Sequence, residues 1–186
     1  MISTKGVQAI EQNNNTPKYI KVGITEVLVA AVKGGSTPNG TPFIEISTEN
    51  AEGATNNSSF YFKEGLNAQI STAALAQIAE ATGTRELVDA IVAKDYEDYG
   101  NKLNTILVGK KFRAKFNGTE KLKRDGSGTW IEVKLGSGIF AESLSVPSTG
   151  SILQWSEEKN VKRLPQGAAS AASAPAQPVV NNDLPF

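Results

Sequence analysis

The chain has 186 residues with 19 Lys and Arg against 19 Asp and Glu, 39% hydrophobic residues and a mean hydropathy of -0.25. This length predicts one ordinary domain with an appendage, and the absence of any apolar stretch near ~18 residues excludes a membrane span. Without cysteine or histidine, the chain lacks disulfides, thiolate nucleophiles, imidazole bases and ordinary zinc sites. We therefore expect a non-enzymatic protein without a cofactor.

The first residues predict a short leader followed by a long strand. Residues 1–17 are polar and indicate a flexible leader, with no signal for export, so we expect a cytoplasmic protein. A run rich in β-branched residues then extends from Tyr19 to Val32. Gly23 interrupts this run, which in a strand indicates a bulge or a sharp bend.

Two further strands are predicted in meander order. The turn-forming segment 34–42 leads into an alternating run that begins at Phe43, which is typical of a hairpin. A polar loop then leads to a third strand around Phe60.

A helical insert is predicted over residues 71–99. Ser71 is a candidate N-cap for an alanine-rich helix that Gly83 would end, and a second helical segment starts at Thr84. A contiguous acidic cluster near its end invites a magnesium-dependent nuclease hypothesis, but such clusters are usually solvated helix ends and two-metal sites use separated elements. We expect no metal there; the cluster comprises Asp95, Glu97 and Asp98.

Strand character resumes at Thr105 and again at Thr129, on either side of a turn-rich segment. Five strands with a helix between the third and fourth have the order of an OB-fold, a partly open Greek-key barrel. The predicted fold class is therefore all-β with a helical insert, an OB-fold-like five-stranded barrel over residues 18–164. After Leu164 the composition changes to small residues and prolines, so residues 165–186 are predicted to be a disordered tail.

The predicted fourth strand carries a basic stripe. Because successive side chains of a strand alternate, Phe112, Ala114 and Phe116 should face the core, and the intervening basic residues should face outward. Residues 110–134 hold eight basic residues against three acidic ones. Such a stripe favours phosphate binding, although lysines on an edge strand also deter aggregation. The candidate phosphate contacts across the domain are Lys21, Lys63, Lys111, Arg113, Lys115 and Lys134.

Aromatic side chains are interleaved with these cations. The same alternation turns one aromatic ring outward on several strands, where unpaired bases could stack at ~1–3 kcal/mol each. For any single ring, a role in covering a helix or the tail is about as probable, so the hypothesis depends on the set. The candidate stacking residues are Tyr19, Phe43, Tyr61 and Trp130.

The last six residues, NNDLPF, are the most specific motif. They resemble the acidic DDDIPF-like tip of bacterial single-stranded DNA-binding proteins, and the preceding linker resembles the linker of that family. Two asparagines replace acids, and the long helical insert is more similar to bacteriophage replication proteins of that class. The resemblance implies that Asp183, Leu184, Pro185 and Phe186 bind replication or recombination proteins.

The stripe, the rings and the tip together predict a protein that binds single-stranded DNA without strong sequence preference. Such a protein would protect DNA during replication, recombination or repair, in the cytoplasm of a bacterial host if a phage encodes it. The alternative is an OB-fold interaction or RNA-binding protein, because this fold serves several ligands. A homo-oligomer is compatible with either function.

Overall fold

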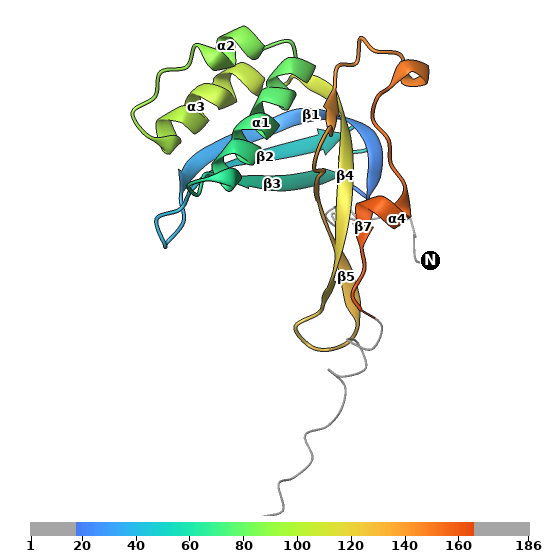
Figure 1. The fold of residues 1–186 in the computed structure, drawn as a ribbon. Helices are drawn as coiled ribbons and strands as arrows, with labels where there is room; N and C mark the ends of the chain where they lie inside the picture. The colour runs from blue at the N-terminus through green and yellow to red at the C-terminus, as the bar shows by residue number, and fades with distance from the viewer. Residues whose placement is uncertain (1–17, 166–186) are drawn as a thin grey trace, which may run out of the picture.

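Seven strands form one sheet with the neighbour order β3-β2-β1-β4-β5, and β6 and β7 both pair with β4 (Figure 1). The computed structural model describes residues 18–165. All strand pairings are antiparallel except that of β7 with β4. The strands are β1 (Gly23–Ser36), β2 (Pro42–Asn50), β3 (Thr55–Tyr61), β4 (Lys111–Leu122), β5 (Thr129–Leu135), β6 (Ala141–Glu142) and β7 (Val161–Lys162).

The alternation of apolar residues determines which face of the sheet is buried. Val27 and Val29 of β1 and Ile44 and Ile46 of β2 are almost completely buried on the inner face. A bulge between Val29 and Ala31 shifts the register of β1 with β2 and lets the long strand curve. At the start of β1, Gly23 has a φ of 132°, which confirms the predicted bend.

β4 pairs with four other strands, β1, β5, β6 and β7. One of its edges pairs with β1 over residues 111–116 and then with β7, while the other edge pairs with β6 and then with β5. Its inner residues Phe112, Ala114 and Phe116 have no exposed surface, as the alternation predicted. The strand therefore links the meander of β1 to β3 with the C-terminal part of the domain.

Three helices between β3 and β4 cover one face of the sheet, above β1, β2 and β3 (Figure 1). They are α1 (Leu66–Ala81), α2 (Arg85–Asp89) and α3 (Tyr96–Leu107); a short α4 (Glu157–Asn160) lies near the C-terminal end of the described chain. Gly83 ends α1 as predicted, because its φ of 68° completes a Schellman motif in which the amide of Thr84 donates to the carbonyl of Ala79.

The insert is longer than predicted. α1 begins at Leu66, so Ser71 lies inside the helix and donates its hydroxyl to the Tyr61 carbonyl at 2.6 Å. α3 continues to Leu107, where a strand was expected from Thr105, because Leu103 and Leu107 share a buried helical face. The fourth strand therefore starts at Lys111.

β3 and β5, the two ends of the strand order, approach each other without forming a ladder. The Asn56 amide donates to the Val133 carbonyl at 2.6 Å, and the Leu135 amide donates to the Ser58 hydroxyl at 2.9 Å. Within residues 18–165 no backbone hydrogen bond joins β3 to β5. The observed class is therefore mixed α/β with an open sheet, in place of the predicted all-β barrel, because the helical insert is large and only side-chain hydrogen bonds join β3 to β5.

None of the helices in the described part of the chain is long and apolar enough to cross a membrane. The predicted leader over residues 1–17 and all of the predicted tail after Pro165 lie outside the described residues.

Candidate functional site

The outer face of β2 and β3 carries a pair of aromatic rings. Phe43 and Tyr61 are direct cross-strand partners, with ring centroids 6.4 Å apart and an interplanar angle of 52°. They point outward because their neighbours Ile44 and Phe60 occupy the inner face. Tyr61 is 47% exposed, so its ring can receive another flat group.

The segment before β1 adds a third ring at the opposite end of β3. Tyr19 forms a parallel bridge with Thr55 and is 73% exposed, whereas Ile20 beside it is buried. The seven residues from Thr55 to Tyr61 span roughly 20 Å at the usual rise of a strand. Lys21 is exposed near Tyr19, and Lys63 is exposed just after β3. Each end of β3 therefore has at least one aromatic side chain and one exposed lysine.

The hairpin of β4 and β5 extends beyond the rest of the sheet (Figure 1). Trp130 is 46% exposed on this hairpin and lies opposite Lys121. The turn is held by Asp125, whose carboxylate accepts from the amide and hydroxyl of Ser127 and has a pKa lowered by these bonds. Its two basic residues, Lys123 and Arg124, are exposed and make no ion pair within residues 18–165.

Glu132 partly neutralises the outer face of the hairpin. Its carboxylate lies 2.6 Å from the Lys121 ammonium and 3.2 Å from that of Lys134. The hydrogen bond from Lys121, and then that from Lys134, lower the pKa of Glu132 against the opposing effect of burial. Lys134 itself remains exposed, so it can still contact an anion.

The predicted basic stripe is only partly open. Arg113 is 8% exposed, and its guanidinium donates to the Glu142 carboxylate at 2.7 Å and to the Val146 carbonyl at 3.1 Å. Lys111 is exposed and Lys115 is partly exposed. Arg113 therefore does not lie on the open surface that the alternation predicted.

The chain after β6 explains this difference. Residues 143–165, which we name the C-terminal arm, return over β4: Leu153 is buried, and the Trp155 indole donates to the Phe116 carbonyl at 3.2 Å. Hydrogen bonds hold its end, where the Leu164 amide donates to Glu120 at 3.1 Å. Simple alternation along β4 cannot reveal a cover supplied by residues 30 or more positions later.

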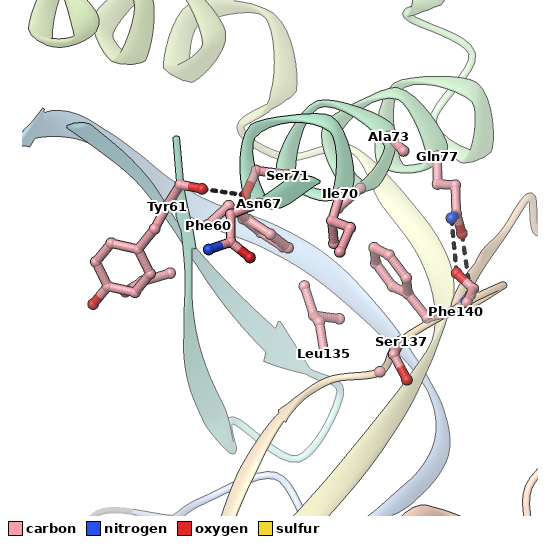
Figure 2. A pocket seen from close by; sticks show the side chains of 14 residues that line it. Phe60, Tyr61, Asn67, Ile70, Ser71, Ala73, Gln77, Leu135, Ser137 and Phe140 are labelled. Atoms are coloured by element: carbon pink, nitrogen blue, oxygen red, sulfur yellow. Dashed lines mark hydrogen bonds between the residues drawn. The ribbon is translucent and has the colours of Figure 1, made fainter. Parts of the chain in front are cut away.

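A hollow that the sequence did not indicate lies between α1, the end of β3 and the glycine-rich loop after β5 (Figure 2). Its volume is about 540 Å³. Ile70, Leu135 and Phe140 point into it, and Tyr61 stands at its edge (Figure 2). No pattern within one segment of the sequence indicates this hollow, because three separate segments form it.

The acidic cluster at the start of α3 has structural contacts. Asp95 caps α3 by accepting from the Asp98 amide at 2.8 Å, and Asp98 pairs with Lys102 at 2.8 Å. The bond from Lys102 lowers the pKa of Asp98. Across residues 18–165, no three acidic side chains gather closely enough to hold a metal ion.

The structure thus brings Phe43, Tyr61 and Lys63 to one end of β3, Tyr19 and Lys21 to the other, and Trp130 to the hairpin. The predicted partner-binding residues Asp183, Leu184, Pro185 and Phe186 lie outside the described residues. No protein-family model and no curated protein sequence matches this chain.

Proposed function

We propose that this protein binds single-stranded DNA without catalysis, through an OB-fold whose barrel is left partly open. The strand order β3-β2-β1-β4-β5, with helices between β3 and β4, supports this fold assignment. Two hydrogen bonds from side chains of β3 to the backbone of β5 support the proposal of a partly open barrel. In OB-folds, the face of the second and third strands and the two hairpin loops bind oligonucleotides.

The observation that carries the proposal is the pair of half-buried Phe43 and exposed Tyr61 on that same face. Rings on an open sheet surface can stack with unpaired bases, and each such contact contributes ~1–3 kcal/mol regardless of sequence. Trp130 on the projecting hairpin and Tyr19 at the start of β3 extend the set. A duplex, whose bases are already stacked, offers no equivalent partner to these rings.

The proposed phosphate contacts differ from the predicted set in two ways. Arg113 is left out because its guanidinium is engaged by Glu142, and the hairpin turn is added because its cations are free of carboxylates among residues 18–165. The resulting set is Lys21, Lys63, Lys111, Lys115, Lys123, Arg124 and Lys134.

The charges on the β2 and β3 face moderate this electrostatic contribution. Glu45 and Glu49 lie on the same outer side of β2 as Phe43. The Ser59 hydroxyl donates to the Glu45 carboxylate at 3.3 Å. Phosphates therefore have to avoid this strip and contact the cations around it. We expect stacking to supply a large share of the affinity, with a moderate dependence on salt.

The proposed role of the C-terminal residues rests on the sequence alone. Asp183 to Phe186 would bind other replication, recombination or repair proteins while the domain holds the DNA. Truncation before Asn181 should leave DNA affinity in place and abolish capture of a replication protein.

A titration of the full chain with oligo-dT, oligo-U and a duplex at two salt concentrations tests the proposal. In a Trp155→Phe background Trp130 is the one tryptophan left, so its fluorescence should be quenched by oligo-dT. Equal affinity for duplex and single strand, or no binding, would contradict the function. Preference for oligo-U over oligo-dT would instead support the alternative of an RNA-binding protein.

A further inference from the structure

The hollow beside Tyr61 has a fixed shape. At one end, the Ser71 hydroxyl ties α1 to the Tyr61 carbonyl at 2.6 Å. At the other end, the Gln77 side chain donates to the Gly138 carbonyl at 2.8 Å and accepts from the Phe140 amide at 3.1 Å (Figure 2). Because both walls are tied, a ligand would enter a preformed cavity and would lose little affinity to ordering.

The lining of the hollow is uncharged. Its walls are apolar, formed chiefly by Ile70, Leu135 and Phe140, and none of its lining residues is acidic or basic. Two polar side chains in the lining, Asn67 and Ser137, make no hydrogen bond to any other group within residues 18–165. Apolar walls with a few unpaired polar groups suit a neutral, flat, hydrogen-bonding ligand.

Cations lie outside this lining, close to the hollow. A Cβ atom built on Gly136, which lines the hollow, would lie 3.1 Å from the Lys115 Cε. Lys63 follows Tyr61 by two residues and is exposed. A ligand that is neutral at one end and anionic at the other would match this distribution of charge.

A nucleotide has this chemistry, and the hollow continues the stacking surface. Tyr61 both pairs with Phe43 on the outer face and stands at the edge of the hollow. A strand that stacks on Tyr61 would therefore bring its next base to the opening.

We propose that the hollow receives one unstacked base of the bound single strand, while the adjoining phosphate lies near Lys115 and Lys63. The inference rests on the proposed function, because it adds a pocket for one base to the surface that binds the strand. Within the pocket, the Asn67 amide would donate to and accept from the edge of the base, as amide side chains do with exposed base edges.

The inference is tested by a substitution that fills the hollow and by its effect on oligo-dT affinity. Ala73 is an exposed lining residue of α1, and Ala73→Phe would occupy the space without altering Tyr61. Gln69→Phe is the matched control, because it adds the same ring to an exposed position of α1 that does not line the hollow. Ala73→Phe should weaken oligo-dT binding about fivefold or more, and Gln69→Phe should change it by about twofold at most.

A second measurement identifies the base itself. Oligonucleotides with one abasic site at each successive position should reveal one position where the unchanged protein loses affinity and the Ala73→Phe protein loses no more. This lack of additivity is expected only if the variant and the missing base affect the same contact. Asn67→Ala, which leaves the space open, should give a smaller loss at the same position.

The outcomes separate this inference from the proposed function. If the unchanged protein does not bind single strands, both fail. If it binds and Ala73→Phe binds equally well, with an unchanged abasic profile, only the pocket is rejected. If Ala73→Phe weakens binding of a synthetic NNDLPF peptide and not of DNA, the hollow is a peptide site and the inference is overturned. Thermal unfolding of both variants shows whether they fold alike.

Discussion

Tyr61 shows how backbone and side chain of one residue can carry separate tasks. Its carbonyl accepts the Ser71 hydroxyl and fixes α1 beside the hollow, while its ring pairs with Phe43. A substitution that removes the ring leaves the carbonyl in place. The ring can therefore be tested without detaching the helix.

Tyr61→Ala should weaken oligo-dT binding by ~1–3 kcal/mol, because one stacking partner is lost. Tyr61→Phe should bind within about 0.5 kcal/mol of the unchanged protein, because it keeps the ring. Fluorescence anisotropy with a labelled oligonucleotide measures both. Equal losses for the two substitutions would show that the hydroxyl, and not stacking, is responsible.

The ion pair of Arg113 and Glu142 links β4 to β6 in a buried setting. Burial opposes ionisation of Glu142, but hydrogen bonds from the Ile152 amide, from Ser151 and from Arg113 outweigh it and lower the pKa below its ordinary value of 4.5. Glu142 therefore stabilises the fold above its ordinary pKa. That contribution is lost as the pH falls through the lower pKa of the folded state.

Glu142→Gln should reduce the free energy of unfolding at pH 7 by up to about 3 kcal/mol, since it removes the buried countercharge of Arg113 and leaves only the exposed Glu26 carboxylate, 3.6 Å away. The difference from the unchanged protein should shrink below the ordinary pKa. Urea unfolding between pH 3 and 7 measures this, with the exposed Glu52→Gln as control. A difference that stays constant with pH would contradict the role of the carboxylate charge.

At the scale of elements, the hairpin of β4 and β5 projects from the sheet and carries two exposed basic residues in its short turn. Asp125 fixes the turn through Ser127, so Lys123 and Arg124 extend from a defined support. The hairpin lies apart from the β2 and β3 face along the sheet (Figure 1). Its contribution to DNA binding can thus be measured separately from stacking.

Arg124→Glu should reduce the slope of log K against log salt by ~0.7, the value for one lost contact with a single strand. Lys94→Glu makes the same charge change at an exposed position before α3, away from the hairpin, and should leave the slope unaltered. Titrations at four salt concentrations give both slopes. An equal reduction in the two variants would indicate a general effect of net charge.

The contact of α3 with β1 depends on two glycines. A Cβ atom on Gly34 would lie 1.7 Å from the Tyr96 carbonyl oxygen, and one on Gly100 would lie 2.2 Å from the Gly34 nitrogen. Backbone atoms cannot move aside as a flexible side chain can. The helix therefore packs directly on the strand at this point, and the Asn104 side chain accepts from the Val32 amide at 2.8 Å beside it.

Gly34→Ala should lower the free energy of unfolding by at least 1–3 kcal/mol, the usual range for overpacking. Gly150→Ala is the control, because a Cβ atom there has no neighbour within 4 Å. Chemical denaturation gives both values. A Gly34→Ala protein of unchanged stability would contradict the close packing.

At the scale of the molecule, the sequence was a good guide where contacts are local. Alternation correctly turned Tyr61 and Trp130 outward and buried Phe112 and Phe116, and Gly23 and Gly83 marked the bend and the helix end. It could not reveal that Arg113 is covered, since Glu142 lies 29 positions away. For the same reason the hollow, which three separate segments form, had no signature in any one segment.

The seam of β3 and β5 gives the sheet one weak line. Elsewhere neighbouring strands are joined by backbone ladders, but here an amide and a hydroxyl from the side chains of β3 hold the backbone of β5. Breaking two such bonds requires far less than global unfolding. In native-state hydrogen exchange, the Leu135 amide should therefore lose its protection well before the amides of β1, because β3 and β5 can separate there while the rest of the sheet stays folded.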